Sequence, residues 1–191
     1  MNEKKLDLRV IKTQNLLYQT LVELLKDKPF EEIKVQDICN TALINRSTFY
    51  AHYSDKYELL AAYINNLKNA LKKELEKNNN ISNTKEYYME MIKLFLNHID
   101  DKRDVYQSAL VNNQNSISMD ILYDVINNDV TRHIQEDVNQ ADIPSTVISR
   151  FYIGAVLNVG IEWLKSNNKY TKDEVIHYLD LLIPDDLNRK K

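Results

Sequence analysis

Glycine and proline constrain this chain most, because they are almost absent from it. Among the 191 residues there are 2 Gly and 3 Pro. All-β folds and glycine-rich phosphate-binding loops need glycine at positive φ angles, so both are disfavoured. The sequence is rich instead in Leu, Ile, Lys, Glu and Asn, and its apolar residues recur at helical spacing. We therefore expect an all-α fold.

The N-terminal third is predicted to contain three helices before a long one. The first is expected over 8–26 and ends before Pro29, which cannot continue the hydrogen-bond ladder. Two short helices follow, within 33–42 and 46–53. Asn45 is placed to cap the second of them.

Capping signals mark the start of the long helix and of the last one. Asp55 with Glu58 and Thr171 with Glu174 both fit a capping box. The long helix runs to about residue 77, where the polar run NNNISNT breaks the apolar pattern. Beyond this break we expect further helices over 84–98, 104–111, 116–138, 144–166 and 171–182.

Composition and targeting signals predict a cytoplasmic protein. The net charge is -3, and residues 1–57 carry nine Lys and Arg against eight Asp and Glu, so a near-neutral part precedes a more acidic remainder. Cys39 is the single cysteine, so no intrachain disulfide can form and a reducing compartment fits. The N-terminus lacks a secretory signal, and no apolar run approaches the length of about 18 residues that a membrane span needs.

No constellation of residues indicates catalysis, a metal or a cofactor. The four histidines are scattered, without an i, i+4 pair or a neighbouring cysteine, so a metal site is not expected. We find no acid–base pair, nucleophile arrangement or phosphate loop. The protein is therefore predicted not to be an enzyme, and Cys39 is predicted to be a buried, inert thiol.

The stretch ALINRSTFYAHYSDKYELL, residues 42–60, concentrates long polar and aromatic side chains in one place. Two short helices joined by a tight turn, between a helix and a long helix, form a helix-turn-helix unit. Ile44, Phe49 and Tyr53 are expected to pack inward from the second short helix. The opposite side, with Arg46 and Tyr50, can then donate hydrogen bonds to the phosphates and base edges of double-stranded DNA.

The segment VQDICNTALINRSTFYAHYSDKYELL resembles the DNA-binding signature of the TetR/AcrR family of bacterial transcription regulators. The resemblance extends back through TQNLLYQTLVELLKDKPFEEIKV. The C-terminal FYIGAVLNVGIEWLKSNNKYTKDEVIHYL is similar to the closing dimer helices of a branch with short C-terminal domains. The resemblance implies a helix-turn-helix DNA-binding domain over 1–55 and a helical regulatory and dimerisation domain over 56–191.

The resemblance also implies which residues contact DNA. Arg46 is the expected base contact, because its guanidinium fork suits guanine O6 and N7. Lys56 lies in the first turn of the long helix, where its ammonium and the exposed N–H groups point to the same place. The full expected set is Lys34, Gln36, Asn45, Arg46, Ser47, Thr48, Tyr50, His52 and Lys56.

Leu43 departs from the family pattern, which commonly has glycine in the turn between the two short helices. If the backbone there has positive φ, a leucine is strained by about 1 kcal/mol or more. Either the turn differs slightly, or the surrounding packing imposes that conformation.

The C-terminal part is expected to hold an effector pocket and a subunit seam. The family places its pocket there, and the aromatic candidates for its lining are Tyr88, Phe95, Tyr106, Tyr123, Phe151 and Tyr152. Gly154 and Gly160 each disfavour a helix interior by about 1 kcal/mol, which suggests the close approach of another helix. Intrachain packing would explain this, as would a two-fold seam. We predict the seam at Val156, Gly160, Trp163 and Leu164, and assign Gly154 to packing inside the body.

The function that the resemblance implies is that of a homodimeric repressor. It would bind a pseudo-palindromic operator and be released by a small-molecule effector, with coupling through the long helix. A first alternative is an activator of the same family that is controlled by a protein partner. A second alternative, from a different class, is a helical adaptor that does not bind DNA.

Overall fold

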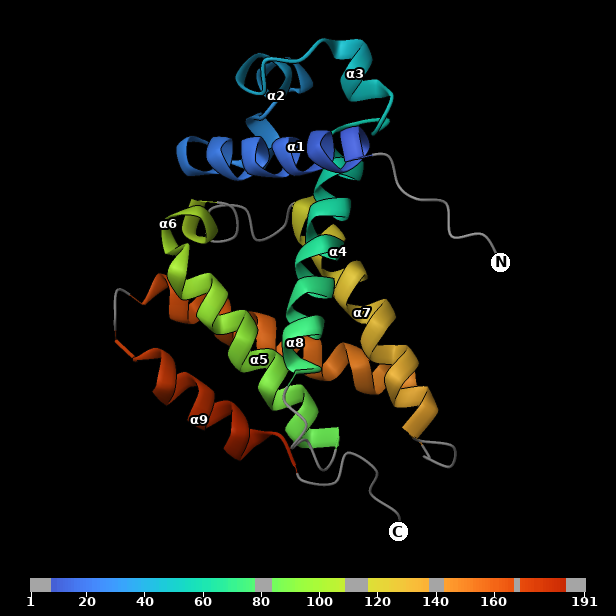
Figure 1. Cartoon of the computed structure of the whole chain (residues 1–191). Coiled ribbons are helices and arrows are strands. Elements are labelled where there is room, and N and C mark those ends of the chain that lie inside the picture. The colour runs from blue at the N-terminus through green and yellow to red at the C-terminus, as the bar shows by residue number, and fades with distance from the viewer. Residues whose placement is uncertain (1–7, 78–83, 109–116, 138–142, 167–168, 185–191) are drawn as a thin grey trace.

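The computed structural model describes residues 8–77, 84–108, 117–137, 143–166 and 169–184. In this part of the chain the secondary structure is helical and no strand occurs, so the predicted all-α class is confirmed. A small upper unit, the head (residues 8–55), stands on a larger group of helices, the body (residues 56–184), as Figure 1 shows. One long helix descends from the head into the body.

The head and the long helix follow the predicted order, with one added element. A single turn of 3-10 helix, which the sequence did not predict, links the first two helices. The third helix is shorter than expected, because Ala51 already caps it. The bounds are α1 (Leu8–Asp27), η1 (Phe30–Glu32), α2 (Val35–Thr41), α3 (Arg46–Tyr50) and α4 (Lys56–Leu75).

The core of the head confirms the predicted inward-facing residues. Phe49 is fully buried, Tyr53 is almost so, and Ile44 packs against the same cluster. Cys39 is buried as predicted, and burial raises the pKa of its thiol. The Tyr53 hydroxyl donates to the hydroxyl oxygen of Tyr18 at 3.2 Å, which ties the segment after α3 to α1.

The start of α4 is capped, although not by the expected reciprocal pair. The Asp55 carboxylate accepts hydrogen bonds from the N–H groups of Tyr57 and Glu58, both at 2.8 Å. The Glu58 carboxylate reaches one residue further back than a capping box requires. It accepts from the Ser54 N–H at 2.6 Å and from the Ser54 hydroxyl at 2.7 Å.

Besides α4, the body contains five further described helices. Their bounds are α5 (Thr84–Asp101), α6 (Arg103–Tyr106), α7 (Ile117–Asp137), α8 (Ser145–Lys165) and α9 (Lys172–Leu182). The predicted capping box of Thr171 and Glu174 is confirmed at the start of α9. Residues 109–111, 116 and 138, which belong to predicted helices, lie outside the described residues. α7 packs against α4 and α8, and α9 packs against α5 and α8.

α8 is a core helix with one buried and one exposed face. Its length and its mean hydropathy of 1.3 would allow it to cross a membrane, but 44% of that segment is buried inside the protein. Ile153, Leu157 and Leu164 belong to the core of the body. This single apolar helix therefore does not indicate a membrane span.

The residues predicted for a subunit seam lie on the buried side of α8, which corrects that prediction. Trp163 is 3% exposed, and its indole N–H donates to the carbonyl oxygen of Tyr170 at 3.2 Å. Leu164 and Gly160 are also buried, and Val156 lines an internal cavity. Helical periodicity shows which residues share a face but not where that face points. The exposed stripe of α8 consists of Val147, Phe151, Ala155, Asn158 and Glu162.

Neither glycine of α8 is required by packing within the chain. A methyl group added at Gly154 or at Gly160 would meet no neighbouring atom within 4 Å. The expectation that Gly154 serves close packing inside the body is therefore corrected, since ordinary side-chain atoms fit there in the single subunit.

Candidate nucleic-acid interface and internal cavity

The turn between α2 and α3 is a Schellman motif with a leucine in the left-handed position. Leu43 has a φ of 54°. Among the described residues it is the only one other than glycine with a positive φ. The Ile44 N–H donates to Cys39 O at 3.0 Å and the Leu43 N–H to Asn40 O at 3.3 Å, as that motif requires. This conformation costs a leucine about 1–2 kcal/mol. The turn thus keeps the geometry that glycine usually provides, with the strain that the sequence led us to expect.

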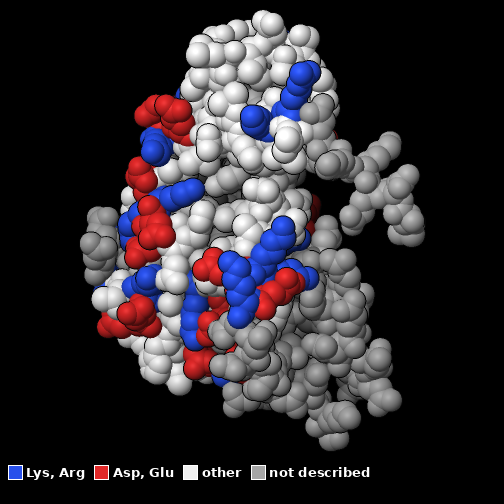
Figure 2. Space-filling view, viewed as in Figure 1, with Lys and Arg blue, Asp and Glu red and all other residues white. Residues whose placement is uncertain are grey.

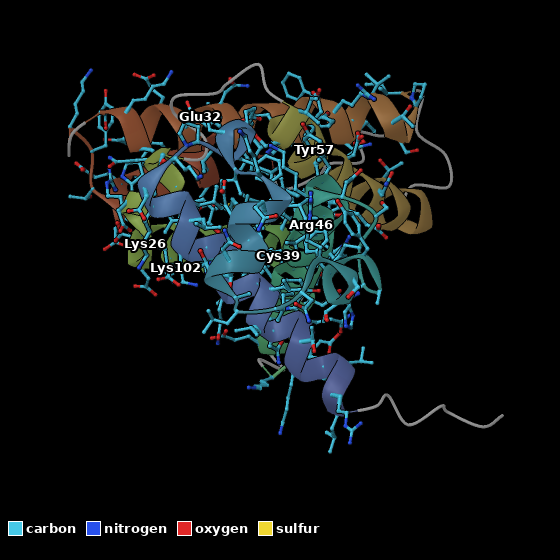
Figure 3. The ribbon with its side chains drawn as sticks, turned by 90° about the horizontal axis from the view of Figure 1, so that it is seen from above. Lys26, Glu32, Cys39, Arg46, Tyr57 and Lys102 are labelled. Atoms are coloured by element: carbon cyan, nitrogen blue, oxygen red, sulfur yellow. The ribbon has the colours of Figure 1, made fainter. Side chains whose placement is uncertain are left out.

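α3 presents a polar and aromatic side to solvent. Arg46 and Ser47 are exposed, and Thr48 is half-buried. Tyr50 is 50% exposed, and its ring stands edge-on against Phe49 with 5.5 Å between the centroids. Arg46 has no hydrogen-bond or ion-pair partner among the described residues, and Figure 3, which looks down on the head, shows it near the middle of that view.

The start of α2 places two predicted residues at the surface. Lys34 and Gln36 are exposed, and Gln36 Nε2 donates to Asn40 Oδ1 at 2.7 Å. A second lysine nearby is used inside the head, because Lys28 Nζ lies 2.6 Å from Asp37 Oδ2. The hydrogen bond from Lys28 lowers the pKa of the Asp37 carboxyl. The Lys34 ammonium makes no ion pair among the described residues and can contact a partner outside the chain, whereas that of Lys28 is paired with Asp37.

Lys56 is turned toward the head, in contacts that we call the Lys56 clamp. Its ammonium donates to the carbonyl oxygens of Phe30 at 2.9 Å and Glu31 at 2.8 Å. It also lies 4.8 Å from the ring centroid of Phe30 and 5.2 Å from that of Tyr57. Burial lowers the pKa of this ammonium. Two of its three N–H donors are engaged, which leaves one for a phosphate.

Asn45 and His52 flank α3. Asn45 occupies the N-cap position, with φ -75° and ψ 151°, but its side chain makes no capping hydrogen bond. Its amide is exposed and can contact a partner. His52 is half-buried, with its ring 6.2 Å from that of Tyr53. The structure thus brings the predicted residues to one end of the molecule. Among them, Lys56 already donates its ammonium hydrogen bonds to the carbonyl oxygens of Phe30 and Glu31.

The head is sparsely charged on the face that Figure 2 shows. The upper part of that face is mostly neither blue nor red, and charged side chains of both signs gather along its left edge and lower half (Figure 2).

A cavity of about 220 Å³ lies within the body and extends to the head. Most of its lining comes from α4, α5, α7 and α8, but Leu25 of α1 and Phe30 of η1 also contribute. Sequence reasoning missed these two head residues, because nothing in a local pattern shows that they meet the body. Four of the six predicted aromatic residues line the cavity, namely Tyr88, Phe95, Tyr106 and Tyr152.

Tyr123 and Phe151 lie outside the cavity, which corrects their predicted place in its lining. Phe151 is 69% exposed and belongs to the outer stripe of α8, about 100° around the helix from Tyr152. The Tyr123 hydroxyl donates to the carbonyl oxygen of Arg150 at 3.3 Å, and the Arg150 guanidinium lies 5.6 Å from the Tyr123 ring. Tyr123 thus links α7 to α8, whereas Phe151 faces solvent.

The cavity lining is almost entirely apolar. Its described residues include no Asp, Glu, Arg or His, and one lysine, Lys68. The Lys68 ammonium is directed at the carbonyl oxygen of Val125, 3.5 Å away. The hydroxyls of Tyr63 and Tyr106 hydrogen-bond to each other, and burial raises the pKa of both, so they remain neutral. The site can bind an apolar molecule but offers little to a charged one.

A helix-turn-helix head with an exposed third helix, carried by a helical body with an internal cavity, defines a DNA-binding transcription regulator. Residues 17–63 match the model of the bacterial regulatory proteins of the tetR family, and residues 86–185 match a transcriptional regulator C-terminal region. The second match alone spans more than half of the chain. The chain belongs to the TetR family of transcriptional regulators. The alternative of an adaptor that does not bind DNA is thereby set aside.

Two relatives agree with this assignment. The chain is 25% identical over 167 residues to the dhaKLM operon transcriptional activator DhaS of Lactococcus lactis, a match that covers 84% of this chain and 83% of DhaS. It is 38% identical over 63 residues to the uncharacterized regulator YxbF of Bacillus subtilis. That second match covers 32% of this chain and spans 17% of the length of YxbF.

Solved structures share the fold. A TetR transcriptional regulator from Streptococcus agalactiae is 22% identical, with a TM-score of 0.65, and the match covers 95% of this chain and 96% of that one. The repressor FadR of Thermus thermophilus, in complex with lauroyl-CoA, is 16% identical, with a TM-score of 0.60 and coverage of 88% and 92%. At these identities the likeness extends to the arrangement of helices alone.

Proposed function

We propose that this regulator is a homodimeric repressor, without catalytic activity, that leaves its operator in the cytoplasm when an apolar molecule fills the cavity. The observation that carries the proposal is the cavity of about 220 Å³, whose walls come from both head and body. A ligand that contacts both parts can bind one of their arrangements more tightly than another and so shift the population. The complex of the FadR neighbour with lauroyl-CoA supports a hydrocarbon chain as the ligand.

The chemistry of the lining supports an uncharged ligand moiety. Burying a charge costs several kcal/mol unless a partner compensates it. The described lining offers one ammonium, on Lys68, and no carboxylate. Burial raises the pKa of the Tyr63 and Tyr106 hydroxyls, so neither supplies a charge. A hydrocarbon or aromatic moiety therefore fits inside, and a charged end group of the same molecule would stay outside.

The wall nearest the head supports a route from the cavity to the DNA-binding helices. Phe30 lines the cavity and is held by the Lys56 clamp. Ser118 of α7 also lines the cavity, and its hydroxyl donates to Glu31 Oε1 at 3.1 Å. A ligand that displaces Phe30 or Ser118 moves η1, which leads directly into α2. The signal would thus reach the operator contacts through η1 and the start of α4.

The exposed apolar side chains support a dimer through the outer faces of α8 and α9. Val147 and Phe151 are 53% and 69% exposed on α8, and Leu181 and Leu182 are 70% and 73% exposed on α9. Clustered exposed apolar residues mark interaction surfaces. A two-fold axis there would present two α3 helices to a pseudo-palindromic operator, with half-sites one DNA turn of about 34–36 Å or a multiple of it apart.

The operator contacts in this proposal are the nine predicted residues. Arg46 reads a base, while Lys34, Gln36, Tyr50 and their neighbours hold the backbone. We keep the division of the chain at residue 55 into a DNA-binding domain (1–55) and a regulatory and dimerisation domain (56–191). Lys56 then stands at the hinge between them.

A second candidate function is activation. The relative DhaS is described as a transcriptional activator, and the match covers 84% of this chain. In that case a protein partner, rather than a small molecule, controls the regulator. Transcription can be measured in vitro from a promoter that carries the operator, with and without the protein. This measurement distinguishes repression from activation.

The deciding experiment for the effector uses a gel shift with DNA from the region flanking the gene. Lauroyl-CoA, dodecanoic acid and 1-dodecanol are added separately to the preformed complex. We expect at least one of them to release the DNA. Val156→Phe, which fills part of the cavity, should bind DNA like the parent but need at least about tenfold more ligand for release, about 1.4 kcal/mol.

Ala70→Phe provides the matched control, because Ala70 is exposed on α4 and away from the cavity lining. It should respond to the ligand like the parent protein. Thermal unfolding of each variant verifies that the fold is kept. If no hydrocarbon compound releases the parent protein from DNA, the small-molecule part of the proposal is wrong.

A further inference from the structure

Leu43 combines two features that are each unfavourable for the isolated protein. Its backbone occupies the left-handed region, with φ 54°. Its side chain is 91% exposed, more than any other large apolar residue in the described part of the chain. Glycine or asparagine would fit this turn with less strain and without exposing an apolar group.

No contact among the described residues offsets these disadvantages. The neighbouring Ile44 packs against the core of the head, but Leu43 does not belong to that cluster. The hydrogen bonds of the turn are made by backbone groups alone, so they do not depend on the leucine side chain. Strained residues whose conformation is retained without local benefit concentrate at functional sites.

The position of Leu43 indicates what its side chain contacts. It lies in the turn that leads into α3, three residues before Arg46, the expected base contact. In a major groove, the one apolar feature of a base edge is the 5-methyl group of thymine.

We propose that Leu43 is a specificity-determining residue that packs its side chain against a thymine methyl group next to the base contacted by Arg46. The inference rests on the DNA-binding activity of the family and not on the dimer or the effector. The leucine side chain supplies the contact, and the left-handed turn directs that side chain away from the head.

Two substitutions separate the contact from the strain. Leu43→Gly removes the side chain and relieves the backbone, whereas Leu43→Ala removes the side chain and keeps the strain. Leu43→Gly should raise the Tm by about 2–4 °C, and Leu43→Ala should leave it nearly unchanged. Both should weaken operator binding by about fourfold per half-site, as expected for the loss of one small apolar contact.

The operator for this test comes from selection of a randomised duplex library by the full-length protein. Each thymine of the selected site is then replaced by uracil, which removes only the methyl group. For the parent, one position per half-site should lose affinity about fourfold, and for Leu43→Gly the same replacement should have no effect.

Three results would overturn the proposal. In the first, both variants bind the selected site as tightly as the parent does. In the second, no thymine-to-uracil replacement distinguishes the parent from Leu43→Gly. In the third, the variants lose affinity equally for selected and random DNA, which would assign Leu43 to the sugar–phosphate backbone instead of a base.

Discussion

The ammonium of Lys56 donates to the carbonyl oxygen of Phe30 at 2.9 Å while lying 4.8 Å from the centroid of the same residue's ring. One residue at the start of α4 thus holds the backbone and contacts the side chain of a residue 26 positions earlier. Phe30 is at the same time a wall of the cavity. The two residues connect the interior of the body with the segment that leads into α2.

The Lys56 clamp predicts a stability effect at a residue that the sequence assigned to DNA. Lys56→Met keeps the aliphatic stem but removes two charge-assisted hydrogen bonds, so the free energy of unfolding should fall by about 1–3 kcal/mol. Lys34→Met is the control, because Lys34 is exposed and its side chain has no described partner. Urea unfolding of both variants tests this, and unchanged stability of Lys56→Met would show that the clamp contributes little.

The scarcity of free cations predicts a shallow salt dependence of operator binding. Arg46 is assigned to a base, so among the predicted contacts Lys34 and the remaining N–H of Lys56 are the cationic groups for phosphates, which gives two per head and four per dimer. The slope of log K against log salt concentration should therefore be about -4. Affinity measured from 50 to 200 mM salt tests the value. A slope steeper than about -6 would mean that cations outside this set bind phosphates.

The two glycines of α8 should respond differently to alanine. Both substitutions find open space within the subunit, so each should raise helix stability by up to about 1 kcal/mol. Gly154 adjoins the exposed stripe with Phe151 and Asn158, whereas Gly160 is buried. Gly154→Ala should therefore weaken the proposed dimer and Gly160→Ala should not. Sedimentation equilibrium measures both, and the opposite ranking would remove the outer face of α8 from the interface.

The carboxylate of Glu58 predicts a pH-dependent contribution to the stability of the head. The Ser54 N–H and hydroxyl both donate to it, the backbone bond being the larger cause, and together they lower its pKa below 4.5. A carboxyl whose folded-state pKa is lowered stabilises the fold above its unfolded-state pKa and loses this effect as pH falls through the folded value. The urea midpoint of the parent should therefore exceed that of Glu58→Gln at pH 7.

The same two proteins should have similar urea midpoints once the pH is below the lowered pKa of Glu58. The glutamine variant provides its own control, because it keeps an acceptor of the same shape without the titrating charge. A difference in midpoint that persists unchanged at pH 3 would assign the effect of Glu58 to packing instead of to its charge.

Local sequence determined the features of this protein that depend on neighbouring residues. The scarcity of glycine predicted the all-α class, and the apolar spacing predicted that Phe49 and Tyr53 face the core of the head. The family pattern pointed to the turn at Leu43, where the positive φ is confirmed. Each of these follows from interactions within about five residues, for which helical geometry and turn stereochemistry give definite rules.

The tertiary structure decided everything that depends on how helices are oriented against one another. Periodicity grouped Val156, Gly160, Trp163 and Leu164 on one face of α8, but only packing showed that this face points inward. The tertiary structure also placed Tyr152 in the cavity wall and the adjacent Phe151 on the surface. It also directed the Lys56 ammonium to Phe30. A sequence pattern fixes the angles between side chains around one helix axis. The rotation of the helix about that axis is set by the burial of apolar surface summed over the whole chain.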